Sequence, residues 1–250
     1  MSLAFNYLNK GVRIMLSLQE REHKKGMFAK KTSENIKKYS ELYAEFCQNG
    51  YTKALAEDYA DFFVENAKKP AHGDIIQTAQ LFDRLHDFKS AAFYLERLED
   101  VTKKMTHEEK FLYCIEALKN KSKLGNWRDA EDFRTENINF MQIHSDKVDM
   151  NQKADMYIAL ALSDCAARHY SSAFRLLTGF GYKPQGRNDV KLLEILTTGV
   201  YICAKSGDTA SVENAVNNAR AALGLFKEFE HSWSKSYYET RIAEAAEGIA

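Results

Sequence analysis

The side chains most often used in metal and redox chemistry are scattered along this sequence. Its seven His form neither an H-x-x-x-H nor an H-E-x-x-H motif, and His86 and His169 fall at expected turns. Zinc sites usually draw their ligands from closely spaced pairs. The four Cys lie 67, 51 and 38 residues apart, which predicts reduced, buried thiols and no disulfide framework. We therefore expect no metal and no cofactor.

Carboxylates are plentiful, but their spacing does not define a catalytic pair. Glu96, Glu99 and Asp100 resemble a solvated helix face, as do the acidic residues between 129 and 132. General acid–base catalysis needs a carboxyl group in an apolar setting, and no such group can be identified. The motifs G-x-S-x-G, G-x-x-x-x-G-K-[ST] and G-x-G-x-x-G are absent. We predict that the chain is not an enzyme, although a deep polar pocket with a buried ionisable pair would reopen that question.

One segment has the residue types needed to contact nucleic acid. "REHKKGMFAKKTSENIKKY", residues 21–39, interleaves basic residues with Phe28 and Tyr39. Phosphate contacts combined with base stacking would require such a mixture. Residues 1–38 hold nine Lys and Arg against three Glu, although the whole chain has no net charge. The possible contacts are Lys24, Lys25, Lys30 and Lys31, but a solvated basic linker is the favoured interpretation.

The composition indicates which elements must position such side chains. Only 12 Gly and 2 Pro occur in 250 residues, too few for the turns of a β-rich chain, so helices are expected. No apolar run reaches the roughly 18–20 residues of a membrane span. The first residues lack the features of a signal peptide. These observations predict a cytoplasmic protein without a membrane contact.

A repeat explains the stretch "KSKLGNWRDAEDF", residues 121–133. A Gly turns the chain at the end of one helix, and a large residue, here Trp127, opens the next helix and is expected to be a buried plug at the hairpin turn. An Ala one turn later permits close packing of the two helices. Similar stretches recur every 37 to 43 residues. Such a period is typical of stacked helical hairpins. The predicted repeat anchors are Tyr51 and Ala54, Phe88 and Ala91, Trp127 and Ala130, and Tyr170 and Ala173.

Capping signals and turn-forming clusters predict the helix boundaries. We expect an N-terminal helix near 3–22 and a basic connector near 23–31, together forming region 1–31. Region 32–226 would contain the repeats, and region 227–250 a C-terminal capping helix near 229–247. In that last helix Trp233, Tyr237 and Ile242 are spaced to cover the final pair. The expected helix pairs are 32–67, 74–104, 107–143, 150–179 and 188–226.

The stretches "LGNWRDA" (124–130), "LHDFKSAAFYL" (85–95) and "AARHYSSAFRLL" (166–177) resemble the tetratricopeptide repeat (TPR) family. The resemblance covers about 32–226 and implies an all-α, right-handed TPR-like α-solenoid of about five helix pairs. The period is near 40 residues instead of 34. His86 and Arg168 also replace the Gly expected at two turns.

The resemblance implies a non-catalytic scaffold or assembly subunit that binds a protein or peptide on its concave face. Longer repeats of this kind also occur in bacterial peptide-sensing regulators, so a peptide-responsive regulator is an alternative. The Lys and Asn clamp of chaperone-binding TPR domains is missing at the counted positions, which argues against that adaptor function. Ordinary helix packing is an alternative role for each candidate on the concave face. These candidates are Tyr39, Tyr43, Gln80, Asp83, Lys119, Ser122 and Tyr201.

Overall fold

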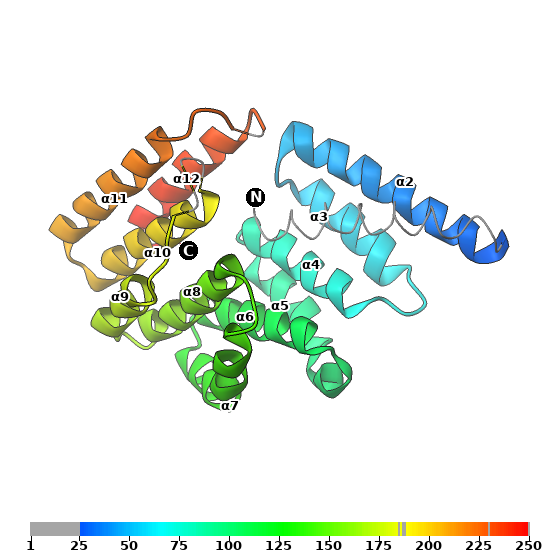
Figure 1. The fold of residues 1–250 in the computed structure, drawn as a ribbon, viewed down its shortest axis with the longest axis horizontal. Helices are drawn as coiled ribbons and strands as arrows, with labels where there is room; N and C mark the ends of the chain where they lie inside the picture. Colours follow the sequence, from blue (N-terminus) through cyan, green and yellow to red (C-terminus); the bar gives the residue numbers. More distant parts are fainter. Residues whose placement is uncertain (1–25, 185, 187–188, 230, 250) are drawn as a thin grey trace.

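The chain is helical throughout the part that the structure describes. A computed structural model describes residues 26–184, 186, 189–229 and 231–249, and only the backbone of 26–33. No strand occurs among these residues, which confirms the all-α class for them. The elements are α2 Gly26–Asn49, α3 Lys53–Ala60, η1 Asp61–Glu65, α4 His72–Arg84, α5 Phe88–Glu96, η2 Glu99–Lys104, α6 His107–Lys123, α7 Trp127–Ser145, α8 Met150–Ala166, α9 Tyr170–Gly179, α10 Val190–Ser206, α11 Thr209–Gly224 and α12 Ser234–Ala246. Figure 1 labels the α-helices among them.

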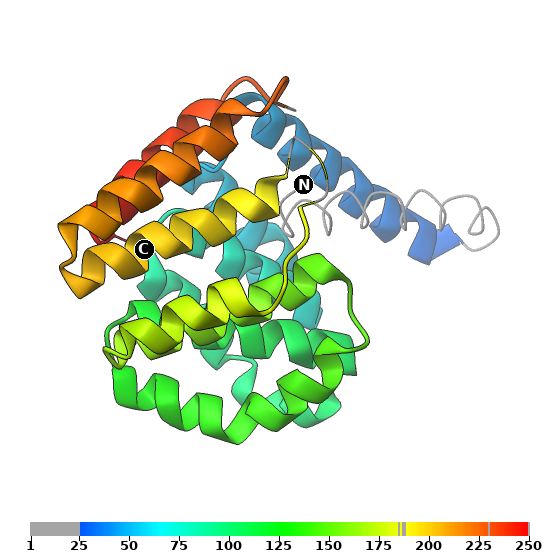
Figure 2. The same ribbon diagram turned by 60° about the vertical axis from the view of Figure 1, so that its left-hand side comes forward.

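Consecutive helices form pairs, and the first helix of each pair packs on the next. Within the pairs α4 contacts α5, α6 contacts α7, α8 contacts α9 and α10 contacts α11. Between pairs α4 contacts α6, α6 contacts α8 and α8 contacts α10. We call α4, α6, α8 and α10 the inner helices. Figure 2 shows α7 and α11 at the periphery, and these two bury far fewer side chains than α6 and α8.

Several predicted boundaries agree closely with the observed helices. α6 begins at His107, where the Thr106 hydroxyl and the Glu109 carboxylate form the expected capping box. α8 begins at Met150, after an Asp149 cap, and α9 ends at Gly179. The N-terminal side differs, because α2 begins at Gly26 and residues 26–31 of the expected connector are helical. The expected helix near 3–22 lies outside the described residues.

The turns between paired helices adopt left-handed backbone conformations. Gly50, Gly125 and Gly207 have φ of 74°, 81° and 78°, as expected of glycines that end a helix. His86 and Arg168 occupy the same place in their pairs, with φ of 58° and 63°. A side chain in this conformation costs about 1–2 kcal/mol. The turn geometry is therefore kept even where the sequence lacks glycine.

The small residue in the first turn of the second helix is buried in three of the four predicted pairs. Ala91, Ala130 and Ala173 have almost no exposed surface. The predicted anchor Ala54 is wrong, because it is exposed while Ala56 is fully buried. Thr52 caps α3, so this helix begins two residues later than the spacing suggested. The buried alanine is therefore also two residues later, at Ala56.

The predicted role of Trp127 as a buried plug is also wrong. Its side chain is 47% exposed, and the Arg128 guanidinium lies 5.4 Å from its ring centroid. Trp127 is the first residue of α7, so no preceding turn of its own helix lies beneath its side chain. Ala130 alone makes the close approach to the core. Phe88 and Tyr170, at the equivalent places, are half-buried.

The last helix joins the two ends of the described array. Ile242 and Ala245 of α12 pack with Leu193 and Val200 of α10, which agrees with a cap on the final pair. Trp233 instead reaches the first pair, where its Nε1 donates a hydrogen bond to the Phe46 carbonyl oxygen at 3.0 Å. Its ring also packs edge-on against Phe46. Figure 1 shows α12 beside α11, with its first turn near the end of α2.

Candidate functional site

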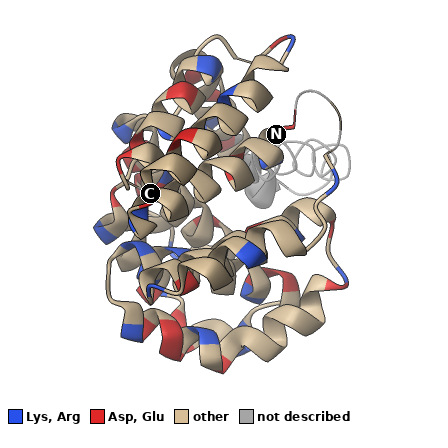
Figure 3. Ribbon diagram, turned by 90° about the vertical axis from the view of Figure 1, so that its left-hand side faces the viewer, with Lys and Arg blue, Asp and Glu red and all other residues tan. Residues whose placement is uncertain are grey.

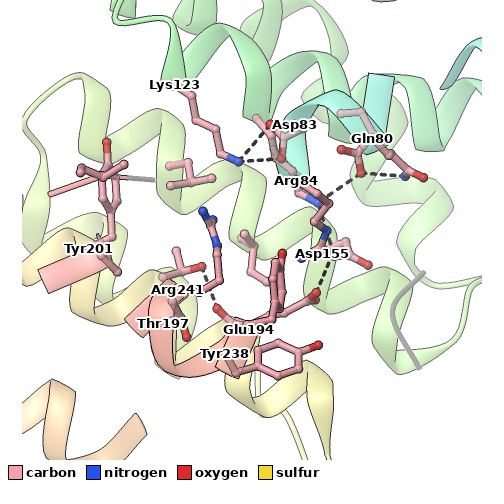
Figure 4. Close-up of a pocket in the computed structure, with 18 residues that line it drawn as sticks. Gln80, Asp83, Arg84, Lys123, Asp155, Glu194, Thr197, Tyr201, Tyr238 and Arg241 are labelled. Carbon is pink, nitrogen blue, oxygen red and sulfur yellow. Dashed lines mark hydrogen bonds and ion pairs between the residues drawn. The ribbon is translucent and has the colours of Figure 1, made fainter. Parts of the chain in front are cut away.

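A charged pocket lies between the inner helices and α12. It encloses a cavity of about 100 Å³. Figure 4 shows side chains from α4, α6, α8, α10 and α12 around it. Ile158, Leu162 and Ala245 provide an apolar part of the wall. The polar lining consists of Gln80, Asp83, Arg84, Glu116, Lys119, Lys123, Asp155, Glu194, Thr197, Thr198, Tyr201, Tyr237, Tyr238 and Arg241.

Helical spacing brings these charges onto one face of each inner helix. Gln80, Asp83 and Arg84 are three and four residues apart on α4, a spacing that places side chains on the same side of a helix. On α6, Lys119 and Lys123 are four residues apart and follow Glu116 at the same face. Because the inner helices pack side by side, the charged faces meet across their contacts.

One ion pair lies at the edge formed by α4 and α6. The Lys123 Nζ donates to both Asp83 oxygens, at 3.0 and 2.8 Å. Burial opposes ionisation of Asp83, but Lys123 outweighs it and lowers the pKa of the Asp83 carboxyl. Burial also lowers the pKa of Lys123, and the Arg241 and Lys119 cations add to that effect. Three cations therefore approach one another here, with Asp83 holding one of them.

A second set of charges forms a continuous chain across α6, α8 and α10. Lys119 lies 3.2 Å from Glu116 and 3.4 Å from the Oδ1 atom of Asp155. Lys191 donates to the same Oδ1 atom at 2.7 Å and also to Glu194. Asp155 and Lys191 are both almost fully buried, so these pairs are shielded from solvent. Buried charges require such pairing to offset their desolvation.

Arg84 connects α4 to this chain. Its guanidinium donates to the Oε1 atom of Glu194 at 2.6 Å, which bridges helices 110 residues apart in sequence. Burial opposes ionisation of Glu194, but Lys191 and Arg84 outweigh it, so the pKa of that carboxyl lies well below its ordinary value. In spite of burial, Glu116 and Asp155 raise the pKa of Lys119. Glu194 and Lys119 therefore remain charged around neutral pH.

α12 adds an arginine and two tyrosines to the pocket. Arg241 lies against the ring of His86 and 3.3 Å from Glu244, which in turn lies 3.1 Å from His86 Nε2. Burial and Arg241 lower the pKa of His86. Burial and the nearby Glu194 carboxylate raise the pKa of Tyr238. The tyrosine hydroxyl therefore keeps its proton at neutral pH.

Four of the predicted concave-face residues line this pocket: Gln80, Asp83, Lys119 and Tyr201. The other three lie elsewhere. The Tyr39 hydroxyl donates to Asp74 at 2.9 Å, and its ring packs on Phe63. Tyr43 packs against the main core, and the Ser122 hydroxyl donates to the Leu118 carbonyl oxygen at 2.7 Å. These three therefore have packing or local bonding roles.

Residues that sequence reasoning missed supply most of the pocket's charge. They are Arg84, Glu116, Lys123, Asp155, Glu194 and Arg241, and Lys191 pairs with Asp155 next to the lining. A signal was present in "VKLLEIL", where Lys191 and Glu194 interrupt an otherwise apolar run at helical spacing. Charges inside an apolar face predict burial with a partner. The partners come from other helices, so local spacing could not identify them.

The basic segment cannot be placed as a site. Lys24 and Lys25 lie outside the described residues, and only the backbone of Lys30 and Lys31 is described, in α2. Over the described helices, both signs of charge are interspersed in the view of Figure 3. The prediction of a nucleic-acid contact therefore stays a prediction.

Further observations concern possible metal ligands, membrane-spanning helices, the thiols and similarity to known proteins. In the described part of the chain no three His, Cys, Asp or Glu are grouped as metal ligands. None of the described helices combines the length and apolar character needed to span a bilayer. The described thiols are free, and Cys114, Cys165 and Cys203 are buried. Comparison of the chain with family models, curated proteins and solved structures gave no match.

Proposed function

We propose that the chain is a non-catalytic binding protein of TPR-like architecture that holds a protein segment or peptide at the inner pocket. The observation that supports this most is a lined cavity in which several charged groups are held in their ionised forms. Glu194 is kept ionised and Lys119 and Lys191 are kept protonated by their partners. Groups so fixed recognise polar ligands well but transfer protons poorly at neutral pH.

The arrangement of the helices fits the TPR-like interpretation. Consecutive pairs present their first helices to one side, and those helices carry the polar lining. α12 occupies part of the same side, so the proposed site is a pocket of limited length rather than a groove along the whole array. Ile249, which is 44% exposed, also lines the cavity and marks where it reaches the surface.

The test blocks the pocket without removing a charge. Thr197 lines the cavity and is half-buried, so Thr197→Arg would fill the pocket with a long side chain. The matched control is Asn218→Arg, on an exposed position of α11. Partners recovered from a lysate of the source organism would be identified by mass spectrometry, and their affinities measured for each variant.

We expect Thr197→Arg to weaken partner binding at least about tenfold, a change of about 1.4 kcal/mol. Asn218→Arg should leave it unchanged, and both variants should retain their helical circular dichroism. Equal affinity of a folded Thr197→Arg variant would exclude the inner pocket as the binding site. Recovery that disappears after nuclease digestion would instead favour residues 21–39.

A further inference from the structure

The pocket contains hydrogen-bond donors that the protein itself does not use. Arg84 donates through one terminal nitrogen to Glu194, and Arg241 uses only its Nη1 atom, toward His86 and Glu244. The other guanidinium nitrogens have no hydrogen-bond partner among the described residues, and they are not sealed from solvent. Both side chains line the cavity, so these N–H groups are available to a ligand there.

The carboxylates of Asp83, Glu194 and Asp155, by contrast, already accept hydrogen bonds from the protein. Both oxygens of Asp83 accept from Lys123. Both oxygens of Glu194 are used as well, one by Arg84 and one by Lys191. Asp155 accepts twice at Oδ1, and its Oδ2 is sealed inside the protein. The ligand that complements this part of the pocket is therefore a hydrogen-bond acceptor.

Three cations of the pocket approach a common space from different helices. In Figure 4 the side chains of Arg84, Lys123 and Arg241 extend from α4, α6 and α12 toward the middle of the cavity. Their side chains are 22%, 8% and 18% exposed, so water screens them only in part. Arg241 and Lys119 help to lower the pKa of Lys123, which means that both of these cations repel Lys123. A bound anion would relieve that repulsion.

We infer that the pocket binds a small oxyanion, a carboxylate or phosphate group, between the guanidinium groups of Arg84 and Arg241, with Lys123 as a third cation. A planar guanidinium offers paired N–H groups that match two oxygens of such an anion. A cavity of about 100 Å³ has room for a group of this size. This inference goes beyond the proposed function, because a free small anion would satisfy it without any protein partner.

The test measures binding of sodium phosphate and of sodium succinate, against sodium chloride at matched ionic strength, by calorimetry and thermal unfolding. We expect at least one of the two anions to bind saturably and to raise Tm. Phosphate alone would identify a phosphate site, and succinate alone a carboxylate site. Absence of saturable binding by both anions at millimolar concentrations would overturn the inference.

Variants of Arg241 locate the binding to the pocket. Arg241→Gln should weaken the affinity for the anion at least about tenfold, which corresponds to about 1.4 kcal/mol. Arg241→Lys keeps the charge but loses the paired donors, so it should also weaken binding, and it serves where the glutamine variant does not fold. Arg175→Gln, at an exposed position of α9, is the control and should bind normally. Unchanged affinity in a folded Arg241 variant would contradict the site.

The outcome is separable from that of the proposed function. Anion binding that depends on Arg241, together with no partner sensitive to Thr197→Arg, would support the oxyanion site and remove the scaffold proposal. A protein partner whose binding is weakened by Thr197→Arg, together with no binding of either anion, would support the scaffold proposal and overturn the oxyanion site.

Discussion

At the scale of single residues, the pocket depends on carboxylates that are held by neighbouring cations, some from the same helix and some from other helices. Glu194 is the clearest case, because Lys191 and Arg84 reach it from its own helix and from α4. A carboxyl group whose pKa is lower in the folded state stabilises the protein only while it is ionised. The contribution is present above the unfolded pKa, ordinarily 4.5, and is lost as the pH falls toward the folded value.

Acid unfolding tests this role of Glu194. The unfolding free energy of the wild type should fall steeply as the pH drops from about 6 to about 3. Glu194→Gln removes the titrating group, so the variant should be less stable at neutral pH and its free energy should fall less steeply. Denaturant titrations at several pH values measure both effects. The exposed Glu213→Gln variant on α11 is the control, and a slope equal to wild type in Glu194→Gln would contradict the assignment.

The two tryptophans of the chain provide a second test at this scale. Trp127 is 47% exposed, whereas Trp233 packs against Phe46, Tyr51 and Tyr237 and makes a hydrogen bond. We expect Trp127→Ala to cost less than about 1 kcal/mol. Trp233→Ala should cost roughly 3–5 kcal/mol, the usual range for deleting a packed aromatic ring. Chemical denaturation distinguishes them, and a larger loss for Trp127→Ala would restore the buried-plug interpretation.

At the scale of helices, the structure places the first-pair contact at Ala56 and not at Ala54. Ala56→Leu would force extra volume into a closed packing position and should cost about 1–3 kcal/mol. Ala54→Leu, two residues away on the exposed side of α3, should change stability by less than about 0.5 kcal/mol. Thermal and denaturant unfolding of the pair measure the difference. The reverse order would mean that α3 starts where the repeat spacing predicted.

Helix identity and turn positions could be predicted from sequence because their causes are local. The capping box at Thr106 and the glycine at 207 act within a few residues, so their patterns are readable in the chain. The repeat spacing did not predict the later start of α3. It placed the helix start at the aromatic Tyr51, whereas the helix is capped by Thr52 and begins after it. Arg84 and Glu194 could not be paired, because 110 residues separate them and only the packing of α4 near α10 joins them.

At the scale of the whole molecule, α12 turns a row of helix pairs into a closed arrangement. Its later residues pack on α10 and α11, while Trp233 contacts the turn between α2 and α3. A contact between residues 187 positions apart restricts how far the two ends of the array can separate. The same helix contributes Arg241 to the pocket, so closure and pocket geometry are coupled through α12.

The contact between Gly50 and Trp233 allows that closure to be measured. A Cβ at Gly50 would lie 2.8 Å from the Trp233 ring, whereas one at Gly125 would meet nothing within 4 Å. Both glycines have positive φ, so each substitution by Ala costs about 1–2 kcal/mol from the backbone alone. We expect Gly50→Ala to cost more than Gly125→Ala, because the added methyl group would displace the indole.

A double-mutant cycle separates the two contributions. In a Trp233→Ala background, Gly50→Ala should cost no more than Gly125→Ala, which gives a coupling of about 0.5–3 kcal/mol between positions 50 and 233. Gly125 and Trp233 share no contact at the added methyl, so their substitutions should be additive. Additive costs for Gly50 and Trp233 would mean that the ends are not joined in solution. If they are joined, opening this contact should also release Arg241 from the pocket and weaken any ligand held there.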